Sequence, residues 1–266
     1  IQFVEKFDGV SFRHAFDLLS EGRRAFTAPG EGVVKRTTTH RLENPLEDAD
    51  DDVVLFWRVV EYYQERLLKT SDALDYLKGR GVYSEEAIER FRLGFSDRSL
   101  GLRLTDSNRR GGAIRSRLQA LGLIRESGHE HFAGSVVLPI YTVKGEVGEM
   151  YGRKITPNLR KGTPLHLFLP GPHEGIWNIE ALEEPEIILC EAPFDALTFW
   201  VNGFRNVTFI YGTEGFTDEL FQALLARKVK RIRIAYDTDE AGNRAATRDA
   251  QRLMVHGIEV YRVKFP

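Results

Sequence analysis

The chain has 266 residues, of which 42% are hydrophobic and 29% are charged, and its formal net charge is −2. This composition allows a packed core in one large or two modest domains, and a near-neutral total still permits a basic face beside an acidic site. No run approaches the roughly 20 apolar residues of a membrane-spanning helix, and no signal peptide is visible. We therefore expect no membrane span and no membrane partner.

The chain contains one cysteine, Cys190, at the end of the apolar run 187–190. A single cysteine cannot form an intrachain disulfide, which is consistent with a reducing cytoplasm. It also excludes a zinc site built from thiolates of this chain, so we expect no zinc here. We interpret Cys190 as a small buried core residue and expect a cytoplasmic protein.

The first 52 residues fall into two segments. Residues 3–19 carry apolar side chains at helical spacing around a glycine, whereas residues 27–52 are rich in Pro, Gly, Thr and charge and have no period. We interpret 27–52 as a linker whose acidic end suits the start of a helix. Because the first residue is Ile1 rather than Met, we expect the chain to begin partway through a longer protein.

The pattern from residue 53 to about residue 123 is helical. Apolar and aromatic side chains cover a wide face of residues 53–68, which indicates a helix packed on others. Ser71 and Ser84 are predicted as the N-caps of the next two helices.

Composition changes after this helical stretch. Residues 134–155 have alternating and β-branched residues on both sides of Lys144 and Gly145, which predicts two strands joined by a turn. A further short strand is predicted at 166–169. From residue 186, short apolar strands alternate with helices, which predicts a parallel sheet covered on both faces. We therefore predict an α/β fold, with a parallel βα domain at 186–266 after a mixed α+β region at 53–185.

Three carboxylates follow two of the predicted parallel strands. Glu191 comes directly after the strand at 186–190, and Asp237 and Asp239 follow the strand at 231–236. Ligands collect at the carboxyl ends of such strands, so we expect these acids to converge. Two carboxylates about 4 Å apart repel by roughly 4 kcal/mol at an intermediate dielectric, and a divalent cation removes this repulsion. Oxygen ligands without His or Cys favour Mg²⁺ or Mn²⁺ over zinc.

Two alternatives remain open at this site. Asp239, followed by Glu240 and Gly242, also has the pattern of a helix N-cap. Asp195 lies one helical turn beyond Glu191, and it is either a further metal ligand or a residue that orients the site.

Basic residues follow the predicted strand pair without nearby acids, namely Arg153, Lys154, Arg160 and Lys161. We predict that this group contacts nucleotide or nucleic-acid phosphates, because guanidinium groups bind phosphate bidentately and phosphate contacts dominate nucleic-acid affinity. Four arginines within 109–117 are interpreted as a solvated helix face. The aromatic residues Tyr151, Phe168 and Trp177 have the pattern of core residues, with base stacking as the alternative.

Three segments together resemble the Toprim signature of topoisomerases and DnaG-type primases: CEAPFDALTF at 190–199, YGTEG at 211–215 and AYDTDEAGNRAA at 235–246. The resemblance implies that Glu191, Asp237 and Asp239 are catalytic and bind metal, with Asp195 as an additional ligand. The primase version usually reads EGY-x-D, so the acids match and the spacer does not.

The resemblance to DnaG-type primases extends upstream in the same order. Residues 62–97 resemble the helical segment before the primase catalytic core, and residues 131–155 resemble its strand pair ending in a Gly-Arg step. Residues 1–26 resemble the tail that follows a primase zinc-binding domain. The family's basic Lys-Tyr-Leu step is replaced by Leu165-His166-Leu167, and Lys161 is the nearest lysine.

The resemblance implies a DNA primase that synthesises RNA primers on a single-stranded DNA template from nucleoside triphosphates, with Mg²⁺ or Mn²⁺. A replicative helicase is an expected partner, through regions not present here. Two alternatives stay open, a Toprim-type metal-dependent nuclease and a non-catalytic nucleic-acid-binding module. The family's next acidic motif would lie beyond Pro266, so we expect the 186–266 domain to be truncated at its C-terminus and this chain to bind one ion weakly and make few primers.

Overall fold

The computed structural model describes residue 16 and residues 44–46, 49–104 and 109–264. Apart from residue 16, the expected helix at 3–19 and the proposed tail at 1–26 lie outside the described residues, as does most of the expected linker at 27–52. At the end of that linker, Leu46 and Ala49 are buried against the helices that follow. None of the described helices is both long enough and apolar enough to cross a membrane.

Helices form the first described part of the chain: α3 (Asp52–Leu68), α4 (Ser71–Gly79), α5 (Glu85–Arg90), α6 (Leu100–Arg103) and α7 (Arg109–Ala120). Helix α3 begins where the Asp51 carboxylate accepts a hydrogen bond from the Val54 N–H. The prediction of Ser84 as the N-cap of α5 is confirmed, since its hydroxyl accepts from Ala87 N. The prediction for Ser71 is wrong by one residue, because Thr70 precedes the helix and Ser71 begins it.

The first sheet contains β1 (Gly94–Ser96), β2 (Ser135–Tyr141), β3 (Val147–Lys154) and β4 (His166–Phe168), in that spatial order and all antiparallel. The predicted turn between β2 and β3 is confirmed, and Gly145 there has a φ of 80°. Strand β1 falls within the stretch predicted to be helical. A strand of three residues is too short to show a period in the sequence. Position 94 requires glycine, because a Cβ there would lie 2.7 Å from the Tyr63 Cβ on α3.

The second sheet contains β5 (Glu186–Cys190), β6 (Val207–Phe209), β7 (Arg231–Ala235) and β8 (Glu259–Arg262), in the order β6-β5-β7-β8. All of its strand pairs are parallel. The connections between these strands contain α8 (Pro193–Val201), α9 (Asp218–Ala226) and α10 (Glu240–Met254), and η1 (Ile179–Glu183) lies just before β5. The predicted α/β fold is confirmed, including Pro193 in the first turn of α8, where its missing N–H costs nothing.

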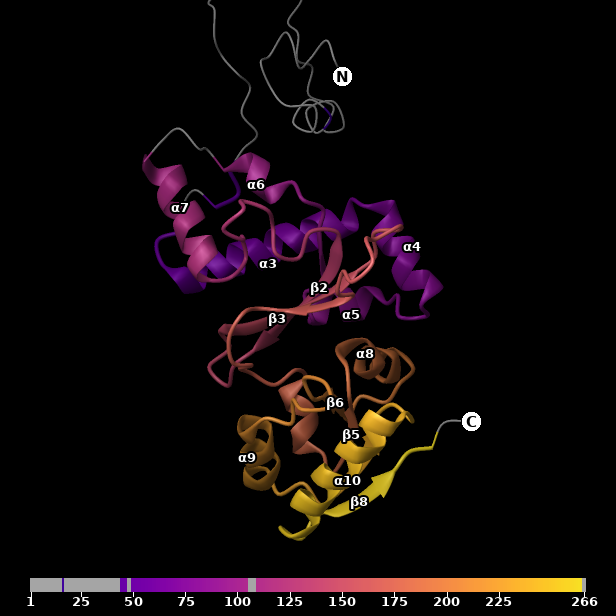
Figure 1. Cartoon of the computed structure of the whole chain (residues 1–266). Coiled ribbons are helices and arrows are strands. Elements are labelled where there is room, and N and C mark those ends of the chain that lie inside the picture. The colour runs from indigo at the N-terminus through magenta and orange to yellow at the C-terminus, as the bar shows by residue number, and fades with distance from the viewer. Residues whose placement is uncertain (1–15, 17–43, 47–48, 105–108, 265–266) are drawn as a thin grey trace, which may run out of the picture.

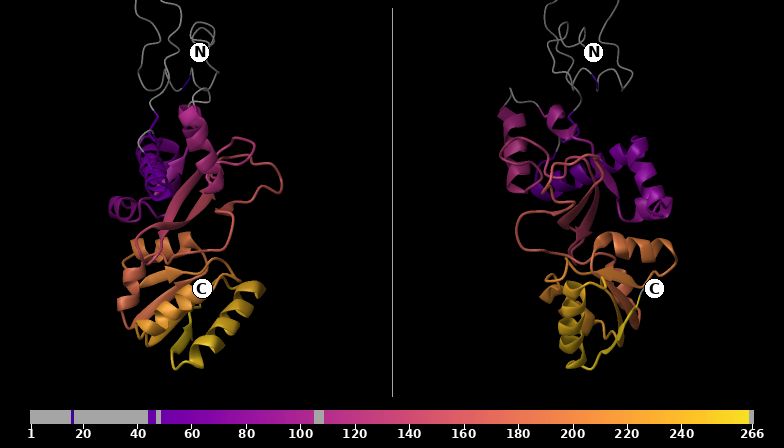
Figure 2. Two further views of the ribbon diagram at one scale, coloured as in Figure 1. Left: turned by 90° about the vertical axis from the view of Figure 1, so that its left-hand side faces the viewer. Right: turned by 45° about the vertical axis from the view of Figure 1, so that its right-hand side comes forward.

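The two sheets form separate layers joined by a shared core. In Figure 1, α3–α7 and the first sheet lie above the second sheet and α8–α10, and the further views of Figure 2 show the same stacking. Helix α8 packs at the join, where Phe194 and Trp200 belong to one hydrophobic cluster with Val136, Leu138 and Phe91. Cys190 is buried in this cluster, as expected, and burial raises the pKa of its thiol.

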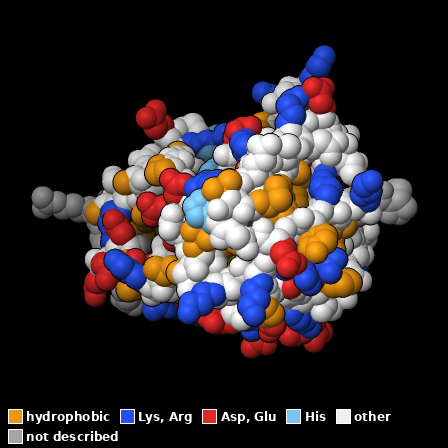
Figure 3. All heavy atoms as spheres, turned by 90° about the horizontal axis from the view of Figure 1, so that it is seen from below, with side chains coloured by type: hydrophobic (Ala, Val, Ile, Leu, Met, Phe, Trp, Pro, Cys, Tyr) orange, Lys and Arg blue, Asp and Glu red, His pale blue; other side chains and the backbone are white. Residues whose placement is uncertain are grey.

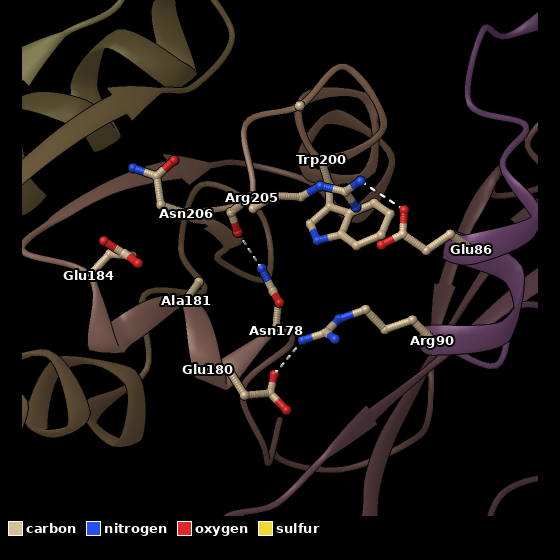
Figure 4. Close-up of a pocket in the computed structure, with 10 residues that line it drawn as sticks. Glu86, Arg90, Asn178, Glu180, Ala181, Glu184, Trp200, Arg205 and Asn206 are labelled. Atoms are coloured by element: carbon tan, nitrogen blue, oxygen red, sulfur yellow. Dashed lines mark hydrogen bonds and ion pairs between the residues drawn. The ribbon is translucent and has the colours of Figure 1, made fainter.

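A hollow of about 640 Å³ lies on one side of this join, between α5 and the region around η1 and the α8–β6 connection (Figure 4). Two ion pairs cross it, Arg205 to Glu86 at 2.8 Å and Arg90 to Glu180 at 3.4 Å. All four side chains are largely exposed, so these pairs contribute little to stability.

Candidate active site

The structure brings Glu191 and Asp237 together at the carboxyl edge of the second sheet. Strands β5 and β7 are parallel neighbours with Cys190 opposite Ala235, so the residues that follow them emerge side by side. The Glu191 carboxylate accepts a hydrogen bond of 3.3 Å from the Asp237 N–H. The expected convergence therefore occurs for Glu191 and Asp237, and it follows from the register of two buried strands.

The charges of the acids act on one another. Partial burial raises the pKa of Glu191, and the carboxylates of Asp237, Asp239 and Asp195 raise it further. Burial and the Asp237 charge also raise the pKa of Asp195, in the first turn of α8. Glu191 and Asp195 are therefore more costly to ionise because of the carboxylates around them.

Asp239 serves as the N-cap of α10, with its Oδ1 accepting from Gly242 N at 2.7 Å. The cap interpretation is therefore confirmed. The metal interpretation stays a prediction, because the cap occupies one oxygen of an exposed carboxylate and leaves the other available.

The backbone around Asp237 is fixed by residues that sequence analysis did not single out. The Arg262 guanidinium donates to the carbonyl oxygens of Tyr236 (2.8 Å) and Asp237 (2.7 Å), and to Asn243 Oδ1 at 3.2 Å. Asn243 in turn donates to Thr238 O. Only the pairing of β8 beside β7 brings Arg262 here, so no local sequence signal could have found it.

Gly242 lets α10 approach the acids closely. A Cβ at this position would lie 2.3 Å from the Asp237 carbonyl oxygen and 3.2 Å from Glu191 Oε2. The small residue is therefore required by a close approach of backbone to the carboxylate group.

The chemistry of these residues fits a divalent cation, since every ligand is a carboxylate and mutual repulsion is present to be neutralised. As the side chains lie, however, the described residues contain no group of three or more Asp, Glu, His or Cys placed to hold one ion. Asp237 and Asp239 are exposed to solvent. If these acids share one ion, their carboxylates have to move closer together than they lie here.

Arg153 faces this acidic group from the first sheet. It lies opposite His166 across the β3–β4 pair, bonds to His166 Nε2, and donates to the Tyr76 hydroxyl at 3.3 Å. The positive charges of Arg80 and Arg153 oppose the rise in the pKa of Asp195. Burial and the same two charges lower the pKa of His166, and the Asp237 charge opposes this shift. Sequence analysis did not assign a role to Arg80 or His166, which reach the site only because the two sheets stack.

The other predicted basic residues do not join Arg153. Side chains alternate along a strand, so Lys154 points to the opposite face, where it donates to Ala133 O at 2.7 Å. Burial and the neighbouring charges of Arg125 and Arg98 lower the pKa of Lys154. Arg160 and Lys161 are exposed in the β3–β4 connection. In Figure 3, acidic and basic side chains lie interspersed on the face that it shows.

The aromatic residues near these strands are mainly core residues. Tyr151 and Trp177 are buried, and Phe168 packs on Tyr151. Base stacking by Tyr151 or Trp177 is therefore not supported by their positions.

Comparison with known proteins agrees with this architecture. Residues 62–162 match the family described as DNA primase catalytic core, N-terminal domain, and residues 188–266 match the Toprim-like family. A DNA primase of Aquifex aeolicus is 30% identical over 79% of this chain and 43% of its own length. A DNA primase of Chlamydia pneumoniae is 25% identical over 100% of this chain and 45% of its own.

Solved primase structures share the fold of this chain. The zinc-binding and RNA polymerase domains of the Aquifex aeolicus primase superpose with a TM-score of 0.67 at 26% identity, covering 100% of this chain and 64% of that one. A DnaG catalytic core, at 24% identity, has the same fold with a TM-score of 0.66 over 81% of this chain and 72% of that one. This chain spans less than half the length of these curated relatives. The two families match in the chain order expected of a primase core, and the chain is therefore a DnaG-type primase core, with a Toprim-like domain as its C-terminal part.

Proposed function

We propose that this chain contains the nucleotidyl-transfer site of a DNA primase, which synthesises RNA primers on single-stranded DNA. The observation that carries the proposal is the acidic group at the ends of β5 and β7, which faces Arg153 across the join between the two sheets. Opposite charges on the two sides suit a reaction in which metal-bound phosphates lie between them. The curated relatives are themselves named DNA primases.

In this proposal Glu191, Asp237 and Asp239 hold Mg²⁺ or Mn²⁺, and Asp195 is a fourth ligand or orients the others. Toprim-like primases use divalent metal in general. When bound, such an ion activates the attacking 3′-hydroxyl and neutralises charge on the transferring phosphate. The chain's own contribution is to hold the acids close together on a backbone that the Arg262 contacts support.

The cationic residues on the first sheet would bind the phosphates. Arg153 and Arg80 lie near enough to the acids to influence the pKa of Asp195, which supports a role for them in binding a triphosphate at this site. Lys154, Arg160 and Lys161 lie outside this group, and we propose that they contact the template backbone instead.

A single incubation tests the proposed activity. The protein is mixed with a single-stranded DNA template, Mg²⁺ or Mn²⁺ and radiolabelled ribonucleoside triphosphates, and products are separated by length. Template-dependent oligoribonucleotides support the proposal. Shortened DNA without RNA synthesis would identify a nuclease instead. If a calorimetric titration detects no metal binding, the acids are structural residues such as helix N-caps and not metal ligands.

A further inference from the structure

Glu149 on β3 is a buried carboxylate that the proposed reaction does not use. Its side chain is 1% exposed and accepts three hydrogen bonds of 2.8 Å, from the N–H groups of Met150 and Leu169 and from His173 Nδ1. Burial raises the pKa of Glu149, and the hydrogen bond from His173 opposes this shift. A buried carboxylate persists in a core only when its partners satisfy it, so these contacts fix the position of His173.

His173 links Glu149 on β3 to the second sheet. It lies in the connection between β4 and β5, and its ring stacks on Tyr211 with centroids 4.4 Å apart and an angle of 5° between the planes. The Tyr211 hydroxyl donates back to the same connection, to Gly175 O at 2.8 Å and Glu174 O at 3.2 Å. His173 is thus held from β3 on one side and from the end of β6 on the other.

The same connection is also fixed by its backbone. Gly175 N donates to Glu219 Oε2 on α9 at 2.7 Å, and Ile176 N donates to Tyr141 O at the end of β2 at 3.0 Å. Gly175 has a φ of 94°, and a Cβ there would lie 2.7 Å from the Tyr141 carbonyl oxygen. Elements from both sheets therefore meet at this short segment.

Tyr211 begins the loop 211–215, which contacts the backbone of Glu191. Within the loop, Tyr211 N donates to Gly215 O and Gly215 N donates to Gly212 O. Gly212 N donates to the Glu191 carbonyl oxygen at 3.2 Å. A continuous chain of contacts thus runs from β3 of the first sheet to the backbone of the central acid.

We propose that Glu149, His173 and Tyr211 form a positioning relay, which holds the 211–215 loop against Glu191 and so sets the acidic group relative to the first sheet. The relay adds to the proposed function, and its predicted effect on metal binding rests on that function. The three residues are positioning residues, because none of them touches the reacting atoms. The relay differs from ordinary core packing in depending on one N–H donor and one stacked ring.

Variants of His173 separate these two contacts. His173→Ala removes both, His173→Phe keeps a stacked ring without the N–H donor, and His173→Gln keeps a donor without the ring. Glu86→Ala is the matched control, because it breaks an ion pair that also crosses between the two parts but lies at the hollow by α5. All are measured in the complete 266-residue chain, by hydrogen–deuterium exchange of the 211–215 amides and by Mn²⁺ titration.

His173→Ala is expected to speed exchange in the 211–215 loop by about tenfold or more, with β2 and β5 unchanged, and to weaken Mn²⁺ binding several-fold. Either conservative variant should restore part of both properties, and the effects of Glu149→Gln and His173→Ala on loop exchange should be less than additive in the double variant. Unchanged loop exchange, no rescue by either variant, or an equal effect of Glu86→Ala would overturn the relay. If the unaltered chain binds no Mn²⁺, the proposed function fails, while loop exchange still decides the relay.

Discussion

The acidic and basic sides of the proposed site are built in different ways. The acids follow strands β5 and β7, and backbone contacts hold them, including the N-cap at Asp239 and the Arg262 bonds to Tyr236 and Asp237. Arg153 on the first sheet is held by side chains, the His166 ring and the Tyr76 hydroxyl. Substitution of an acid itself should therefore change the chemistry with little change in folding, whereas substitution of Arg153 removes a charge and also leaves His166 and Tyr76 without their partner.

The largest effect is expected for Asp239→Asn, which separates the role of Asp239 as an N-cap from its proposed role as a metal ligand. Asparagine is as good an N-cap as aspartate, so Asp239→Asn should keep α10 and its melting temperature. It removes one negative charge from the proposed metal site. We expect primer synthesis to fall by at least about 100-fold, the upper end of the loss seen even for outer-shell partners of metal ligands.

The control for this variant is Asp51→Asn, the equivalent change at the N-cap of α3. It should leave both stability and primer synthesis unchanged. Full Mg²⁺-dependent activity in Asp239→Asn would show that Asp239 is only a cap.

Gly242→Ala should disturb the acidic side through the backbone. The added Cβ would lie 2.3 Å from the Asp237 carbonyl oxygen, which cannot rotate away, so the segment after β7 must move. We expect a loss of about 1–3 kcal/mol in the free energy of unfolding, as for other overpacked positions, together with weaker Mn²⁺ binding. Denaturant titration and calorimetry measure the two effects.

Gly112→Ala on α7 is the matched control, because an added Cβ there meets nothing within 4 Å. A helical glycine replaced by alanine without a clash should gain roughly 0.5–1 kcal/mol. If Gly242→Ala behaved in the same way, the close approach of α10 to Asp237 would be unimportant.

The same contrast explains what could be predicted from sequence. The second sheet was predicted correctly because apolar strands such as 187–190 alternate with capped helices, and parallel strands bring Glu191 and Asp237 to one edge. Arg80, His166 and Arg262 were not predicted as site residues, because each depends on the stacking of the sheets or on the pairing of β8. Lys154 was grouped with Arg153 by adjacency, although strand alternation directs it to the other face.

Arg153→Ala should have a smaller effect, on binding rather than on folding. We expect affinity for single-stranded DNA or nucleotide to fall by about tenfold or less, equivalent to about 1.4 kcal/mol at most. The slope of log affinity against log salt should flatten by about 0.7 if one single-strand phosphate contact is lost. Fluorescence anisotropy at several salt concentrations measures both quantities.

Arg58→Ala is the control for this binding measurement, since Arg58 is an exposed α3 residue near Glu61. It should leave the salt slope unchanged. An Arg153→Ala protein with unaltered affinity and slope would remove Arg153 from the phosphate site.

The smallest effect concerns a buried carboxylate in the first part of the molecule. Glu130 accepts hydrogen bonds from the Tyr63 and Ser96 hydroxyls and from Gly101 N, and burial raises its pKa. Within the described residues, no salt bridge to Glu130 offsets the cost of ionising it there. Its ionisation therefore opposes folding.

The sign of the pH dependence follows from this raised pKa. Above the usual glutamate pKa of about 4.3, the folded state still holds the proton that the unfolded state has lost, so stability falls as pH rises toward the folded-state pKa. Glu130→Gln removes this contribution, whose slope is at most about 1.4 kcal/mol per pH unit. The unfolding free energy of the variant minus that of the unaltered protein should therefore increase with pH across this window. Urea titrations at several pH values, with exposed Glu126→Gln as the control, measure this difference, and a flat or decreasing difference would mean that the Glu130 carboxyl is stabilised in its charged form.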